Sequence, residues 1–102
     1  MDMTQAAYNI KYKVSPYFDH QPINAAYLFG SFSRGEEKAD SDIDIIVVLD
    51  KTQHVGLFKL SQMNIDLEKI LNRKVDLISD GSLKSYVATE ADKDKILIYE
   101  RC

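Results

Sequence analysis

Three aspartates stand out in this sequence because their spacing would bring their carboxylates together. Asp42 and Asp44 are two residues apart at the start of the apolar run 43–49, and Asp76 lies inside a later apolar run, 75–78. Residues two apart in a strand point to the same face, so Asp42 and Asp44 should project together. If the strand that carries Asp76 pairs beside the first strand, three carboxylates converge on one patch.

Such a patch is unfavourable without a cation. Two carboxylates about 4 Å apart repel by roughly 4 kcal/mol at an effective dielectric constant near 20. They must therefore take up protons or bind a metal ion. Three oxygen ligands with no neighbouring histidine or cysteine favour Mg²⁺ or Mn²⁺ over zinc. We therefore predict a divalent-metal site at Asp42, Asp44 and Asp76.

A candidate phosphate-binding turn precedes the aspartates. Gly30 ends a buried apolar run, and a residue without a Cβ lets backbone N–H groups approach a phosphate closely. Ser31 adds a hydroxyl and could cap the following turn, whose amino-terminal end favours anions. Arg34 can reach the same anion with two guanidinium donors, and Gly35 lets the chain turn away. Phosphate and metal contacts together indicate a site for a nucleoside triphosphate.

The order of these motifs is more specific than any one of them. A lone D-x-D is common and is usually a solvated turn, and a lone Gly-Ser pair is weaker still. Here a strand ends in Gly-Ser, ten residues (32–41) follow, and the D-x-D then opens an apolar strand. In haloacid-dehalogenase-like phosphatases and many sugar transferases the D-x-D follows a hydrophobic strand instead. The order in this chain therefore disfavours both families.

The elements that must position these residues belong to a small α/β (α+β) domain, which we expect to span residues 1–102. Apolar periodicity predicts a central mixed sheet of about four strands with flanking helices. Over 8–14 the apolar residues fit both the period of a helix and the alternation of a strand. We favour a helix that begins near Met3 and is interrupted near Pro16. The other expected elements are strands at 25–29, 43–49, 75–78 and 96–99, the last at an edge, and helices at 56–72 and 83–92.

Composition excludes several classes of protein. The chain has 102 residues and a net charge of −3, and its 13 Lys and Arg residues are scattered, so the basic footprint of a nucleic-acid-binding protein is missing. We therefore expect no direct nucleic-acid binding. The sequence contains no signal peptide and no run of 18 apolar residues, and its one cysteine, Cys102, stands alone. These features predict a cytoplasmic protein that does not enter a membrane.

The segment 28–45, which reads LFGSFSRG at its start and SDIDI at its end, resembles the signature of the DNA-polymerase-beta-like nucleotidyltransferases. Within that superfamily the chain is similar to the MNT-domain proteins, the minimal nucleotidyltransferases often paired with a HEPN-domain toxin. The resemblance extends to 75–78 and to the ending 98–101. It implies that two Mg²⁺ ions are bound by the three aspartates. It also implies that Gly30 and Ser31 contact the triphosphate of ATP, and we add Arg34 and Ser41 as further candidate contacts of the nucleotide.

The resemblance also implies a function. MNT-domain antitoxins adenylylate a tyrosine of their cognate HEPN ribonuclease, so we expect AMP transfer from ATP to such a partner, in a homodimer or a complex with the toxin. At 102 residues we expect no separate acceptor-binding domain. Two alternatives remain: a small-molecule nucleotidyltransferase similar to aminoglycoside-modifying enzymes, and an antitoxin that acts by binding alone. The complete acid set argues against the second, because unused buried carboxylates destabilise a fold.

Overall fold

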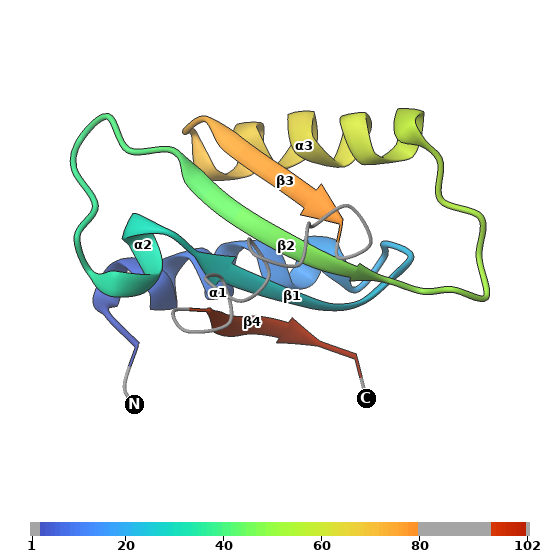
Figure 1. Cartoon of the computed structure of the whole chain (residues 1–102), viewed down its shortest axis with the longest axis horizontal. Coiled ribbons are helices and arrows are strands. Elements are labelled where there is room, and N and C mark those ends of the chain that lie inside the picture. The colour runs from blue at the N-terminus through green and yellow to red at the C-terminus, as the bar shows by residue number, and fades with distance from the viewer. Residues whose placement is uncertain (1–2, 80–94, 102) are drawn as a thin grey trace, which may run out of the picture.

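The described part of the chain folds into a four-stranded mixed sheet with two long helices on one of its faces (Figure 1). The computed structural model describes residues 3–79 and 95–101. The strand order is β3-β2-β1-β4; β1 is antiparallel to β2 and β4, and β3 is parallel to β2. In chain order the elements are α1 (Gln5–Phe18), β1 (Ile23–Phe29), α2 (Ser31–Arg34), β2 (Ile43–Leu49), α3 (Leu57–Leu71), β3 (Val75–Ser79) and β4 (Ile96–Glu100).

The sequence pattern predicted most of these elements. The predicted α+β class, the mixed sheet of four strands and the flanking helices are confirmed. β2 has the predicted bounds, whereas β1, β3 and β4 are each one or two residues longer than expected. The helix predicted at 83–92 lies outside the described residues. Among those described, no helix is long and apolar enough to cross a lipid bilayer.

The core lies between the helices and one face of the sheet. Alternate residues of β2, namely Ile43, Ile45 and Val47, are at most 2% exposed and belong to the same apolar cluster as Phe18 of α1 and Leu67 of α3. Because neighbouring residues in a strand point to opposite faces, the residues between them point away from α1 and α3. One face of the sheet therefore packs against the core, and the acidic residues of the sheet lie on the opposite face.

The predicted interruption of the first helix near Pro16 is wrong, because α1 continues to Phe18. The helix begins at the N-cap Thr4, whose hydroxyl accepts a hydrogen bond from the Ala7 N–H at 3.1 Å. Proline removes one hydrogen bond from a helix, and here the loss falls in the last turn. Phe18 is fully buried, so its packing holds that turn in helical form despite the proline.

Arg101 ties the end of β4 to the connection between α1 and β1. Its guanidinium donates hydrogen bonds to four backbone carbonyl oxygens at 2.7–3.4 Å and stacks on the Tyr99 ring at 5.9 Å. The accepting residues are Phe18, Asp19, Gln21 and Ile23. A cation is favourable at this place because the carboxyl-terminal carbonyls of a helix carry partial negative charge.

We predict that Arg101→Gln lowers the free energy of unfolding by about 2 kcal/mol, because charge-assisted hydrogen bonds to otherwise unpaired carbonyls are lost. Urea unfolding at neutral pH measures this change. Arg101→Lys keeps the charge but cannot reach four carbonyls, so it should recover only part of the loss. A glutamine variant within about 0.5 kcal/mol of wild type, the range of an ordinary surface substitution, would contradict this role.

Two side chains of α3 bind the outer strand β3. Asn64 Oδ1 accepts the Leu77 N–H at 3.0 Å, and Glu68 Oε2 accepts the Val75 N–H at 3.0 Å. Asn64 and Glu68 are four residues apart, so they lie on one side of the helix. Their bonds hold the residues directly before and after Asp76 and thus fix the position of that aspartate along the sheet.

Candidate active site

The pairing of β2 with β3 places Asp44 directly beside Asp76. In the parallel register these two residues are partners, and on its other side Asp44 is the partner of Phe29 in β1. Asp42 stands immediately before β2 and is exposed, as is Asp76, whereas Asp44 is half-buried. The structure therefore brings the predicted aspartates to one end of the sheet, on the face that α1 and α3 leave uncovered.

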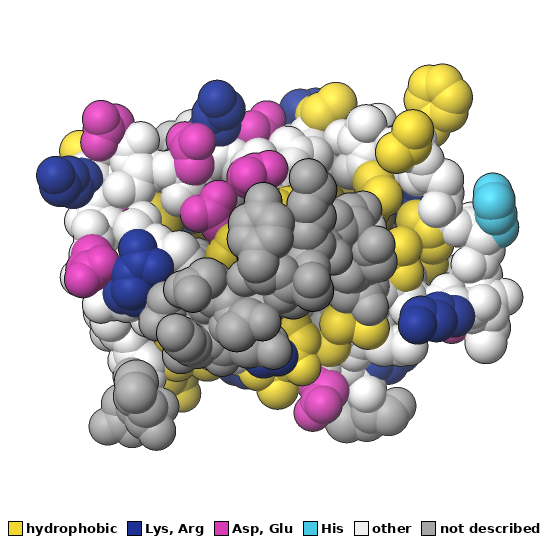
Figure 2. Space-filling model, in the orientation of Figure 1, with side chains coloured by type: hydrophobic (Ala, Val, Ile, Leu, Met, Phe, Trp, Pro, Cys, Tyr) yellow, Lys and Arg dark blue, Asp and Glu magenta, His cyan; other side chains and the backbone are white. Residues whose placement is uncertain are grey.

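The site holds negative charge in excess. Burial is the main cause that raises the pKa of Asp44, and the charges of Asp76 and Asp42 raise it further. Arg34 acts in the opposite direction and lowers this pKa. Figure 2 shows Asp and Glu side chains gathered on this face, over the ends where β2 and β3 begin. The fold therefore makes the negative charge of Asp44 less favourable than it is in the unfolded chain, and a cation that approached would offset this cost.

The donor set fits a hard divalent cation. Three carboxylates can offer the oxygen ligands that Mg²⁺ prefers, and their mutual repulsion is the unfavourable term that such an ion would remove. In the part of the chain that the structure describes, no three His, Cys, Asp or Glu side chains already form a closed metal-binding cluster. The backbone register thus brings the aspartates to one end of the sheet, while their side chains as placed do not form a group that could hold a metal ion.

Position 30 must be a glycine because the Asp44 side chain lies close to its backbone. Its φ of 75° and ψ of −152° lie in a region that glycine alone adopts without strain. A Cβ on Gly30 would overlap the Oδ2 atom of Asp44. The sequence indicated a glycine that lets a phosphate approach; the structure shows that this glycine also makes room for the carboxylate of the next strand.

The turn after Gly30 is short. α2 contains four residues and begins at Ser31, and Gly35 ends it with a φ of 71°. The predicted turn of the chain at Gly35 is thus confirmed. One turn of helix aligns few peptide dipoles, so an anion at Ser31 would rely on backbone N–H groups and the serine hydroxyl. The helix-end field expected from the sequence contributes little here.

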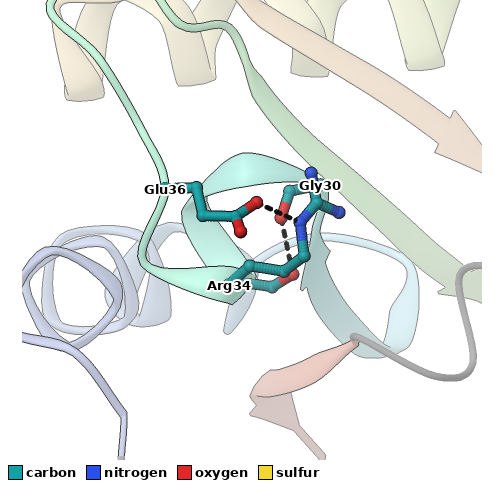
Figure 3. Close-up of polar contacts among 4 residues, drawn as sticks. Gly30, Arg34 and Glu36 are labelled. Atoms are coloured by element: carbon teal, nitrogen blue, oxygen red, sulfur yellow. Dashed lines mark hydrogen bonds and ion pairs between the residues drawn. The ribbon is translucent and has the colours of Figure 1, made fainter.

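Arg34 is engaged by an acidic neighbour. Its Nε donates to Glu36 Oε1 at 2.7 Å, and the two side chains point towards one another (Figure 3). Within the same turn the Ser33 hydroxyl donates to the Gly30 carbonyl at 2.7 Å, which fixes the peptide that follows β1. A phosphate that binds Arg34 would therefore meet a guanidinium already paired with Glu36, a competitor that the sequence pattern did not reveal.

Ser41 has a structural role in the loop between α2 and β2. Its hydroxyl accepts the Lys38 N–H at 2.7 Å, and its own N–H donates to the Lys38 carbonyl at 3.0 Å. These two bonds close a turn just before Asp42. Ser41 was predicted to contact the nucleotide, and the structure shows its hydroxyl oxygen accepting a hydrogen bond within the turn.

Arg73 is the residue near the site that sequence reasoning missed. It lies between α3 and β3, and its Nη1 donates to the carbonyl oxygens of Lys38, Ala39 and Ser41 at 2.8–3.2 Å. The only available signal was its place three residues before Asp76, just before a strand that carries a candidate ligand. A basic residue at such a place is usually solvated, so the sequence pattern alone could not single it out.

Sequence comparison identifies relatives of this chain. The family model for polymerase beta nucleotidyltransferases matches residues 12–102. A Methanocaldococcus jannaschii protein, named a protein adenylyltransferase by inference, is 37% identical over 81 residues, which cover 78% of this chain and 81% of the relative. The protein adenylyltransferase MntA of Thermococcus cleftensis is 38% identical over 71 residues, which cover 70% of each chain.

Solved structures share the fold. A chain of a toxin–antitoxin crystal structure with AMP-PNP superposes with a TM-score of 0.73 at 22% identity, covering 92% of this chain and 73% of that one. A chain from the complex of a tri-AMPylated Shewanella oneidensis HEPN toxin with an MNT antitoxin gives a TM-score of 0.66 at 21% identity. That match covers 97% of this chain and 74% of the other. At these identities the likeness concerns the fold.

Proposed function

This chain belongs to the polymerase beta nucleotidyltransferase family, as its sequence signature predicted, and from that membership we propose that it adenylylates a partner protein. The donor would be ATP, the acceptor a tyrosine hydroxyl of a HEPN-domain toxin, and the setting the cytoplasm. The adenylyltransferase names of two relatives support the reaction. The observation that carries the proposal is that Asp44 pairs with Asp76 on one side and lies against Gly30 on the other.

Each residue of the site then has a role. Gly30 and Ser31 would orient the triphosphate through backbone N–H groups and the serine hydroxyl, and Arg34 would add positive charge. Asp42, Asp44 and Asp76 would hold Mg²⁺, which when bound would neutralise phosphate charge and acidify the acceptor hydroxyl. The acceptor oxygen forms a bond to the α-phosphorus of ATP. The bond from that phosphorus to the oxygen that links it to the β-phosphorus breaks, and pyrophosphate leaves. The proton of the acceptor hydroxyl passes to solvent.

The geometry suits an acceptor that another protein presents. Asp76 is exposed on the outer strand of the described sheet, on the face that α1 and α3 leave uncovered. A tyrosine on a partner surface can approach an exposed carboxylate of this kind. The solved complex of an AMPylated HEPN toxin with an MNT antitoxin supports a partner of this kind.

Two alternatives make different predictions. An antitoxin that acts by binding alone gains nothing from a half-buried Asp44 whose negative charge is disfavoured in the fold, and this speaks against it. A small-molecule nucleotidyltransferase would use the same carboxylates but would need a pocket for its acceptor.

We expect ATP labelled at the α-phosphate to transfer its label to the cognate HEPN protein when it is mixed with this chain and MgCl₂. The toxin should lose its ribonuclease activity in step with labelling, and a chelator should prevent both changes. Gel autoradiography and peptide mass spectrometry identify the labelled residue. Label that appears only on a small molecule supports the small-molecule nucleotidyltransferase. Inhibition of the ribonuclease without any label would overturn adenylylation.

A further inference from the structure

We propose that Arg73 is a positioning residue for the reaction proposed above, on which this inference rests. Arg73 holds the loop 36–42 against the two other segments that form the site. Its guanidinium contacts the loop and α2 at once, while its backbone leads directly into the strand that carries Asp76.

The contacts with the loop are close. The Nη1 hydrogens of Arg73 are shared by the carbonyl oxygens of Lys38 at 3.2 Å, Ala39 at 3.1 Å and Ser41 at 2.8 Å. The shortest of these bonds is to the residue immediately before Asp42. One charged group therefore fixes three peptide units of the loop.

The same guanidinium lies over an aromatic ring of the phosphate-binding turn. The Arg73 Cζ atom is 5.1 Å from the centroid of the Phe32 ring, and Phe32 is 5% exposed in the one-turn helix that follows Gly30. The next residue, Lys74, accepts the Ile43 N–H at 2.9 Å through its carbonyl oxygen. Arg73 and its neighbour thus join α2, the start of β2 and the start of β3 at a single point.

This point is where the structure must resist charge repulsion. Asp42 is exposed on an irregular segment outside β2, so the strand ladder does not hold it. The like charges of Asp44 and Asp76 push its carboxylate outwards. With the Ser41 carbonyl bound to Arg73, the backbone before Asp42 cannot swing away. An arginine is required because a lysine ammonium has neither the flat face that lies on Phe32 nor the fork that spans several carbonyls.

The chain provides a matched control for a test of this role. Arg101 also donates to several backbone carbonyls and also stacks on an aromatic ring, but it does so beside Ile23. Ile23 is at the opposite end of the seven-residue strand β1 from Gly30, about 20 Å away. Arg73→Gln and Arg101→Gln therefore remove equivalent contacts, near the site and far from it.

We expect Arg73→Gln to lower kcat for AMP transfer by about 10- to 100-fold, or to raise the Mg²⁺ concentration for half-maximal rate by as much, as is typical when a group that orients metal ligands is removed. The KM for ATP should stay within about threefold of wild type, because Gly30 and Ser31 are untouched. Arg101→Gln should reduce stability but keep the wild-type kcat and Mg²⁺ dependence. The proposal would be overturned if Arg73→Gln and Arg101→Gln changed kcat and the Mg²⁺ dependence equally, when both are measured well below their unfolding temperatures.

Amide hydrogen exchange gives a second readout that needs neither metal nor partner. In Arg73→Gln the amides of 38–42 should exchange at least tenfold faster than in wild type, while those of β2 are unchanged. Arg73→Lys keeps the charge and should show the same faster exchange even if the glutamine variant folds poorly. Unchanged exchange in the lysine variant would overturn the role of Arg73. A wild-type protein that labels no partner refutes the proposed function but leaves this measurement interpretable.

Discussion

Replacing Asp44 with asparagine should lower the rate of AMP transfer by about a thousandfold while it makes the metal-free protein more stable. The rate falls because a carboxylate between Asp76 and the Gly30 turn is lost, and the charge stabilisation that a bound metal supplies is worth several kcal/mol. Single-turnover labelling with the HEPN partner measures the rate. An Asp44→Asn variant that keeps wild-type activity would remove this residue from the site.

The gain in stability follows from the raised pKa of Asp44. In the folded protein burial and the neighbouring aspartates hold this pKa above its ordinary value, so the folded state binds the proton more tightly than the unfolded chain does. Stability in a chelator should therefore fall as the pH rises from the ordinary pKa through the raised one, and it should stay low at neutral pH. Asp44→Asn lacks this charge, so it should melt at a higher temperature than wild type at neutral pH and lose this contribution to the pH dependence.

Asp50 provides the opposite case as a control. Hydrogen bonds from Thr52 and Gln53 to its carboxylate lower the pKa of Asp50 and favour its charged form. Asp50→Asn should therefore not stabilise the protein at neutral pH, and transfer activity should be unchanged because Asp50 follows β2 at the end away from the site. If both asparagine variants stabilised the chelated protein equally, a general effect of reduced negative charge would explain the result.

Gly30→Ala should reduce both stability and transfer. The φ and ψ of Gly30 impose a strain of about 1–3 kcal/mol on any residue with a Cβ, and that Cβ would also overlap the Asp44 carboxylate. Moving a reactive group by about 1 Å can slow a reaction roughly a hundredfold. We expect a loss of that size in transfer rate per folded molecule, measured in Mg²⁺ after the folded fraction has been determined by urea unfolding.

Gly56 offers the control for this substitution. It has a negative φ and open space around the position of a Cβ, so alanine there meets no neighbour. Gly56→Ala should change the free energy of unfolding by less than about 1 kcal/mol, since a weaker N-cap and a less flexible unfolded chain offset each other. Its transfer rate should equal that of wild type. A Gly30→Ala variant with the same two properties would contradict the close approach of Asp44.

The parts of the fold that local pattern determines were predictable. A near-continuous apolar run marks β2, and the D-x-D at its start placed the carboxylates at the correct end of the sheet. The sequence left the pairing of the Asp76 strand with β2 as a condition, and the structure meets it with a parallel pairing in which Asp44 and Asp76 are partners. The prediction failed at Pro16, where the helix continues to Phe18. Burial of Phe18 stabilises the last turn by more than the proline destabilises it, so tertiary packing overrides a local preference.

The supporting contacts of the site could not be predicted in this way. Arg73 reaches carbonyls more than 30 positions earlier in the chain, and no periodicity describes such a contact. Asn64 and Glu68 read as the polar side of an amphipathic helix, whereas in the structure they bind backbone groups of β3. Ser41 and Arg34 were selected by residue type, yet their partners, Lys38 and Glu36, depend on the shape of a loop that only the folded chain defines.

The α3 side chains on the outer strand have a consequence for how copies of this protein meet. An open strand edge is a template on which another polypeptide can add, and such addition leads to aggregation. On β3 the Val75 and Leu77 amides are already bound by Glu68 and Asn64, so an incoming strand finds these donors occupied. The strand that bears Asp76 can therefore lie at the edge of the sheet, where a substrate can reach it, without promoting aggregation of the protein.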